Sequence, residues 1–402
     1  MALLTLAALS VGGAWLWSVG PPPGSTPAPS AEPRPATSPP DHRIEVDGRV
    51  VVRLSPLGTA MGFEESGGNL VDIEIDGRDI GFGSMTTFLD REFPRQGKYD
   101  RLLVLPEGGL RSLGRDSGDE RISVQTDWQL APGEGRGVLA QLSIKTSVRN
   151  EGDEAILDYE LGDIIAWGEL EHFAPGPGLK LAGIDQPIDW LGASNQRAAL
   201  LIGSSRRLSG PHGSSWSDPV YRSVDLLPGE SAVVERTLFI GERLGDLIGP
   251  ALEGLGRSST TLQARVEEEL SHRAIPDSTL VISRRSPQGK WEPIARTRMD
   301  EQGGARVAVE PGGLLLEASA PDRRSLDPVE VSVSHQPAVP AVVRLSGAGR
   351  LGLDVRDKSG APLPARADFR GVPPTPDPNF GPPTELLGRH RAYFDGSTEV
   401  PL

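Results

Sequence analysis

Short runs of alternating apolar and polar residues, separated by turn-forming residues, dominate the sequence after residue 41. Two such runs flank Asp47-Gly48, and Val71, Ile73 and Ile75 alternate with acids before Asp76-Gly77. A period of two is typical of a β-strand with one buried face, and Asp-Gly suits a tight hairpin turn. The 402 residues include 49 glycines and 37 prolines, well above their average share of about 12 %. The sequence therefore predicts a mainly β fold of many short antiparallel strands rather than a helical bundle.

This pattern predicts one large antiparallel β-sandwich over residues 44–243. Further strands are expected at residues 121–125, 138–148, 156–161, 198–202, 220–226 and 232–240. The best helical candidate after residue 43 is Leu244–Leu255, whose glycines keep it short. We expect residues 244–261 to connect the large sandwich to the units that follow.

The first 43 residues predict export. Residues 1–20 carry no ionisable side chain, and a helix of that length would be about 30 Å long, close to the hydrocarbon thickness of a bilayer. A basic n-region is missing and Ala28-Pro29-Ser30 is a poor cleavage site, so a cleaved signal peptide and an uncleaved anchor both stay open. Residues 21–43 are rich in proline and predict an extended linker. We expect a periplasmic or extracellular protein that contacts a membrane only through its N-terminal segment.

Composition narrows the function classes. The formal net charge is −14, which argues against a nucleic-acid partner because such proteins present a basic face. The chain has no cysteine, so disulfides, thiolate metal sites and cysteine nucleophiles are excluded.

The residues after the helical segment contain a weak internal repeat. Val266–Glu269, a turn and Ala274–Pro276 line up with Val355–Lys358, a turn and Pro362–Pro364. Two copies of one small β-sandwich module are therefore predicted, over residues 262–346 and 347–402. The second copy reaches only the equivalent of an early strand at Glu399–Leu402, so we expect it to be incomplete.

Motifs for catalysis or metal binding are absent from the sequence. The six histidines are isolated, and no H-x-H or H-E-x-x-H pattern occurs, so the sequence predicts no metal site. The string Gly135–Ala140 matches G-x-G-x-x-A, but an expected strand follows it instead of a helix. A hairpin is therefore the better interpretation.

Aromatic, acidic and imidazole side chains gather in the second half of the large sandwich. Tryptophans beside acids and hydroxyls are typical of sugar sites, where the rings form a stacking floor. They are equally typical of a sandwich core and of ordinary loops. The candidate ligand-binding residues are Trp167, Glu171, His172, Trp190, His212, Trp216 and Asp218.

The C-terminal part resembles a known module. Gly349–Asp357, Gly360–Arg366 and Phe369–Gly371 resemble the carboxypeptidase-regulatory-like, prealbumin-like module. Thr375–Pro382 and Asp395–Leu402 are similar to the stretch that precedes the catalytic domain in exported bacterial PHP-type metallohydrolases of the CehA/McbA group. This resemblance implies a mutarotase-like super-sandwich followed by one or two prealbumin-like sandwich modules.

The resemblance carries over no catalytic residue, metal ligand or cofactor. In that family the metal-binding residues belong to the PHP domain, which would follow Leu402, and the sequence has no match to its H-x-H motif. We therefore expect a non-catalytic accessory region, as a fragment or truncated reading frame, that binds a carbohydrate or cell-envelope polymer beside a downstream catalytic domain. Two alternatives stay open. One is an epimerase-like enzyme in which Glu171, His172 and Asp218 converge in one cleft, and the other is a purely structural spacer.

Overall fold

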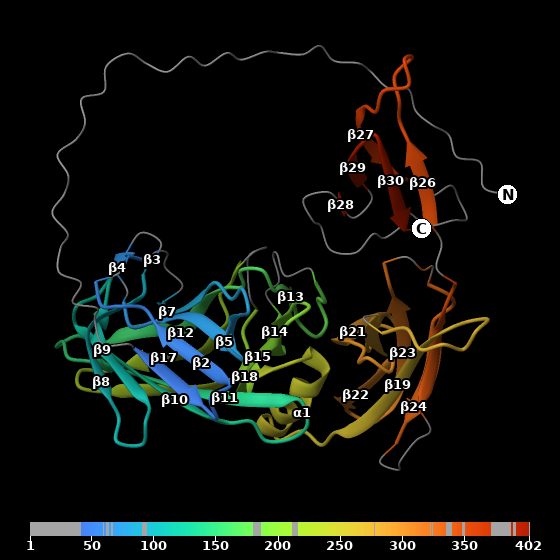
Figure 1. Ribbon diagram of the computed structural model, residues 1–402. Coiled ribbons are helices and arrows are strands. Elements are labelled where there is room, and N and C mark those ends of the chain that lie inside the picture. The colour runs from blue at the N-terminus through green and yellow to red at the C-terminus, as the bar shows by residue number, and fades with distance from the viewer. Residues whose placement is uncertain are drawn as a thin grey trace, which may run out of the picture.

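The computed structural model describes residues 42–58, 60–61, 64–65, 67–90, 95–179, 186–210, 216–276, 278–321, 323, 325–334, 340–347, 350–370, 387–388 and 391–401. The predicted targeting segment, nearly all of the proline-rich linker and His212 lie outside these residues. The fold is mainly β, as the sequence predicts, with one helix among the described residues (Figure 1).

Two eight-stranded antiparallel sheets face each other in the large sandwich. The first sheet contains β1 (Arg43–Val46), β2 (Val50–Leu54), β5 (Leu70–Ile75), β6 (Arg78–Asp79), β7 (Ser84–Leu89), β12 (Ile156–Ala166), β16 (Trp216–Ser217) and β17 (Val220–Leu226). The second contains β8 (Gly97–Val104), β9 (Leu110–Asp116), β10 (Ile122–Pro132), β11 (Val138–Asn150), β13 (Glu171–Phe173), β14 (Ile188–Ser194), β15 (Ala199–Leu208) and β18 (Ser231–Gly241). A short hairpin, β3 (Ala60–Met61) with β4 (Glu64–Glu65), lies outside both sheets.

The alternating apolar and polar residues of the sequence lie on opposite faces of these sheets. In β11, every second residue from Val138 to Asn150 is buried, and the residues between them are partly or fully exposed. Side chains from both sheets, including Trp128, Tyr159 and Trp167, form one apolar core. The Gly135–Ala140 string belongs to the hairpin between β10 and β11, in agreement with the hairpin interpretation.

Helix α1 (Leu244–Gly254) follows the large sandwich and lies between it and the next unit (Figure 1). Its buried residues contact β14, β15 and β18 on one side and β21 and β22 on the other. Gly245 allows the close approach, because a Cβ there would lie 2.7 Å from the Thr297 hydroxyl oxygen. The expected connector is thus a packed element as well as a link.

The first module is a small sandwich of two sheets. The three-stranded sheet contains β19 (Thr260–Glu268), β22 (Gly304–Val309) and β25 (Ala341–Leu345). The four-stranded sheet contains β20 (Thr279–Arg285), β21 (Trp291–Arg298), β23 (Gly312–Ser319) and β24 (Val329–Val333). All pairs are antiparallel except β19 with β25, which is parallel.

The second module, in red in Figure 1, has two sheets of its own: β26 (Arg350–Asp354) with β30 (Ser397–Pro401), and β27 (Pro364–Asp368) with β28 (Leu387–Gly388) and β29 (Arg391–Asp395). The two modules share a hydrogen-bond pattern. Val266 N donates to Gly303 O at 2.8 Å, and Val355 N donates to Gly396 O at 2.7 Å. Ile275 N donates to Val266 O, and Leu363 N donates to Val355 O, both at 3.0 Å. Both glycines have positive φ, 67° and 79°, so the aligned residues of the repeat fold in the same way.

Candidate functional site

Trp167 and Trp216 lie at the end of the first sheet. Trp167 is 1 % exposed, and its Nε1 donates a hydrogen bond to the Ser217 hydroxyl at 2.9 Å. Trp167 therefore belongs to the core of the sandwich, and the expectation that it forms part of a stacking floor is wrong. Asp218, the next residue after Ser217, is also buried, with 6 % exposed.

Trp216 is the exposed tryptophan of the candidate set. It pairs with Ala166 of β12, which pairs in turn with Ser84 of β7. Directly opposed residues share one face of a sheet, so the indole lies in one row with two small side chains. The neighbouring residues Ser217, Ile165 and Met85 form the next row and are buried on the inner face. Trp216 therefore presents its ring, 40 % exposed, on the outer face of the first sheet.

Trp190 lies on the face of the second sheet that points away from the core of the large sandwich. It is 1 % exposed and stacks on Phe173, with the ring centroids 5.8 Å apart and the planes at 28°. Both rings belong to an apolar cluster separate from the sandwich core that contains Trp167. The two buried tryptophans thus pack in different cores, and Trp190 also offers no exposed floor for a sugar.

Glu171 and His172 lie on β13, an edge strand of the second sheet. The Glu171 carboxylate forms an ion pair with Arg296 of β21 at 2.7 Å. His172 is half-buried, and this burial lowers its pKa below the ordinary value although Glu171 acts in the opposite direction. The ion pair therefore places Glu171 in the contact between the large sandwich and the first module. Trp167, Trp216 and Asp218 form one group, and Glu171, His172 and Trp190 form another.

The second group belongs to a contact region that we call the joint, formed by α1, β13, β14, β15 and β18 on one side and β20, β21 and β22 on the other. One continuous apolar cluster runs through it, and its members include Trp190, Leu201, Phe239, Leu247, Ile248, Leu262, Ala295 and Val307. These residues come from the large sandwich, the helix and the first module. The three parts therefore all contribute to this one cluster, which is separate from the inner core of the large sandwich.

Polar contacts also cross the joint. Gly176 N donates to Pro293 O at 2.7 Å, and Arg298 donates to the carbonyl of Gln196. Arg257, just after α1, forms an ion pair with Asp189 of the large sandwich at 2.8 Å and lies 3.6 Å from Glu310 of the first module. These contacts fix how the large sandwich and the first module are oriented.

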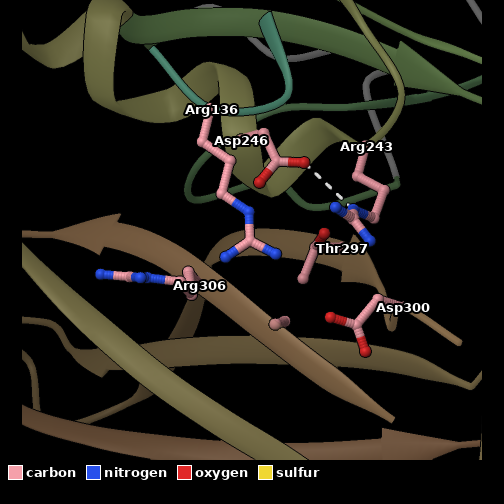
Figure 2. A pocket seen from close by; sticks show the side chains of 7 residues that line it. Arg136, Arg243, Asp246, Thr297, Asp300 and Arg306 are labelled. Atoms are coloured by element: carbon pink, nitrogen blue, oxygen red, sulfur yellow. Dashed lines mark hydrogen bonds and ion pairs between the residues drawn. The ribbon is translucent and has the colours of Figure 1, made fainter. Parts of the chain in front are cut away.

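A small polar hollow lies at one end of the joint (Figure 2). Arg136 enters from the β10–β11 hairpin, Arg243 and Asp246 come from the start of α1, and Asp300 and Arg306 come from the first module. The Arg243 guanidinium and the Asp246 carboxylate are 3.0 Å apart. Burial raises the pKa of Asp246, and the hydrogen bond from Arg243 acts in the opposite direction. The hollow has a volume of about 10 Å³, which is room for about one water molecule.

Sequence reasoning did not find the residues of this hollow. They come from four separate stretches of the chain, and none of these stretches forms a motif. Arg136 and Arg243 border expected strands and Asp246 lies in the expected helix, but charged residues at such positions are also usual on any solvated surface. Their proximity depends on how the two units pack.

The described residues contain no group of three or more histidine or acidic side chains suited to hold a metal ion. Within the same residues, the single helix is not of the length and apolarity needed to cross a membrane.

No family model and no curated protein matches the chain. Among solved structures, a polysaccharide lyase matches with a TM-score of 0.32 and 13 % identity, over 68 % of this chain and 45 % of the lyase. The Bacillus anthracis TIE protein matches with a TM-score of 0.21 and 10 % identity, over 88 % of this chain and 67 % of that protein. This chain thus spans less than half of the lyase. Both TM-scores are below 0.5, so neither protein indicates what this chain binds or does.

Proposed function

We propose that the chain is a non-catalytic accessory region of an exported protein, which holds a carbohydrate or cell-envelope polymer in a fixed position relative to neighbouring domains. The observation that carries this proposal is the joint. The large sandwich and the first module both contribute to one apolar cluster and are linked by the Glu171–Arg296 ion pair. Such a contact suits a positioning role, because units joined only by a flexible linker would not keep a bound polymer in register.

The polymer-binding surface that we propose is centred on Trp216. A ring that is 40 % exposed, in a row with the small side chains of Ala166 and Ser84, leaves space for a flat apolar face of a sugar. The net charge of −14 favours a neutral or basic polymer over a polyanion. The other two tryptophans of the candidate set act in this proposal only as core residues that hold the strands in place.

We also propose that the parent protein is a PHP-type metallohydrolase. The support is the resemblance of Thr375–Pro382 and Asp395–Leu402 to the stretch before the catalytic domain in that family. In this proposal the metal and the chemistry belong to a separate domain. Export remains part of the proposal and rests on the uncharged residues 1–20.

Titration with oligosaccharides, followed by tryptophan fluorescence and by product analysis, tests this function. The panel would contain neutral oligosaccharides and an anionic polyuronate, with Trp216→Ala as the test variant. Trp291→Ala is the control, because Trp291 is partly buried in the first module beneath Arg285, 5.1 Å from the ring centroid. We expect saturable binding of a neutral oligosaccharide without turnover, lost in Trp216→Ala and retained in Trp291→Ala.

Other results would favour the alternatives. Sugar epimerisation or ring opening that depends on Glu171 and His172 would support an epimerase. This would require Glu171 to leave its ion pair with Arg296. Absence of binding across the panel would support the purely structural spacer and contradict the binding role.

A further inference from the structure

The outer face of the second sheet carries a row of alternating charges across four neighbouring strands. Directly opposed residues of β9, β10, β11 and β18 form this row, which we call the charge row: Arg111, Asp127, Lys145 and Glu235. The positions next to them on the same strands, such as Thr126 and Thr146, are buried in the core of the large sandwich. Successive side chains of a strand point to opposite faces, so the charge row lies on the face that points away from that core.

Within one molecule the four charges are paired two by two and stay accessible. Arg111 donates two hydrogen bonds to Asp127, both at 2.6 Å. The Lys145 ammonium and the Glu235 carboxylate are 2.8 Å apart, and these two side chains are 53 % and 67 % exposed. The charge row is therefore a solvent-facing line along which positive and negative groups alternate at the spacing of the strands.

Reversal of the charge row produces its complement. Two copies can face each other around a two-fold axis that runs parallel to the strands and passes between β10 and β11. In that arrangement Arg111 of one copy faces Glu235 of the other, and Asp127 faces Lys145. Every charge of the row gains a second neighbour of opposite sign. An axis along the row would place like charges against each other, so the charges select the axis that is parallel to the strands.

The next row of the same face is complementary in the same arrangement. It contains Leu113, Gln125, Ser147 and Val233. Leu113 of one copy faces Val233 of the other, which is 37 % exposed, and the Gln125 amide faces the Ser147 hydroxyl. Apolar groups therefore meet apolar groups, and hydrogen-bonding groups meet each other, without a change of register.

We propose that this face of the second sheet binds a second copy of the chain, with the charge row at the centre of the interface. Complementary charges determine the orientation of the two copies more than the affinity between them. Trp216 belongs to the first sheet and stays uncovered in this dimer. The inference is therefore independent of saccharide binding.

The size of the face indicates a reversible dimer. Four strands about 4.8 Å apart, each covered over about seven residues, present roughly 450 Å² per copy. A total near 900 Å² is below the ~1,200–2,000 Å² that stable complexes bury. We therefore expect monomer and dimer to exchange, with a dissociation constant in the micromolar range or weaker.

Analytical ultracentrifugation of the full chain over a range of concentrations tests the proposal. Lys145→Glu places carboxylates against each other in the dimer, and Asp127→Lys does the same with cations. Each variant should raise the dissociation constant at least tenfold, because like charges would face each other across the interface. Asp76→Lys is the control, since Asp76 forms an equally exposed ion pair with Arg49 beside the first sheet. It should leave the association unchanged.

An equimolar mixture of Lys145→Glu and Asp127→Lys gives the most specific readout. In the mixed dimer the introduced glutamate faces the introduced lysine, and the unchanged Asp127 of one copy faces the unchanged Lys145 of the other. We expect the mixture to dimerise although neither variant does so alone, which would also show that both variants are folded. Arg111→Glu mixed with Glu235→Lys repeats the test at the ends of the charge row if either central variant does not fold.

Three results would overturn the proposal. The first is a wild-type chain that stays monomeric at all concentrations. The second is equal association of the wild type and all variants, as contacts through the uncharged residues 1–20 would give. The third is a mixture of folded variants that stays monomeric.

Discussion

At the scale of single residues, the most demanding feature is a charged pair enclosed in the core of the large sandwich. Arg236 of β18 donates two hydrogen bonds to Asp163 of β12, at 2.8 and 2.7 Å, and both side chains are fully buried. Arg236 also donates to the Thr146 hydroxyl, which is hydrogen-bonded to Thr126. Burial raises the pKa of Asp163, and Arg236 acts in the opposite direction. The pair links the two sheets and leaves no free charge.

Asp163→Asn should destabilise the large sandwich strongly, because it leaves the Arg236 charge buried without a counter-ion. Breaking a buried ion pair in this way typically costs about 3–5 kcal/mol. The measurement is urea unfolding followed by tryptophan fluorescence. Glu235→Gln is the matched control. Glu235 lies on the same strand as Arg236, and its ion pair with Lys145 of β11 is exposed. Equal losses of unfolding free energy in the two variants would contradict this prediction.

His172 should make stability depend on pH. Burial lowers the pKa of His172 in the folded chain below 6.5, the ordinary value that applies to the unfolded chain. Between these two values the unfolded chain binds more protons than the folded one. The stability contribution is therefore present above pH 6.5 and is lost as the pH falls through the lowered value. His172→Gln should flatten the pH dependence of unfolding below pH 6.5. A slope of the same size in His172→Gln would contradict the assignment.

At the scale of elements, helix α1 determines how the units are joined. Its apolar residues face two partners at once, since Leu247 and Ile248 lie in a cluster with Phe239 of the large sandwich and Val307 of the first module. A helix of 11 residues with an internal proline is marginal alone. Its stability must therefore come from the joint.

Leu247→Ala should weaken both units together. The side chain is fully buried, and truncation of a buried leucine costs about 2–5 kcal/mol. Hydrogen exchange at β18 and at β22 measures each side of the joint separately, and we expect both to accelerate. Glu253→Ala, at an exposed position of the same helix, is the control. Acceleration confined to β22 would show that the helix belongs to the first module alone.

The sequence predicted the strands well because their signal is local. Expected strands at residues 138–148 and 232–240 lie within β11 and β18, and the residues of both Asp-Gly turns have positive φ. The candidate site was predicted poorly because exposure depends on distant partners. Trp167, Trp190 and Trp216 have similar neighbours in sequence, yet two are buried in different cores and one is exposed. No local pattern shows that Glu171 will meet Arg296.

At the scale of the whole molecule, the described residues divide into regions with very different amounts of core. The large sandwich has an extensive apolar core, and a second cluster joins it to α1 and the first module. The third cluster, in the second module, contains only two buried residues and is separate from the others. Buried apolar area is the main source of stability, so the second module should open independently of the rest.

Hydrogen exchange of the full chain should therefore show two levels of protection. Amides of β11, β18, β19 and β22 should exchange together at the slowest rates, because the joint makes their units unfold as one. Amides of β26 and β30 should exchange at least about a hundredfold faster, through opening of the second module alone. The comparison of β26 with β19 is the sharpest, because the two strands share a hydrogen-bond pattern and differ in the core beneath them. Similar protection of β26 and β19 would contradict this order. It would mean that the second module is held closed by more apolar contact than Phe369 and Ala392 provide.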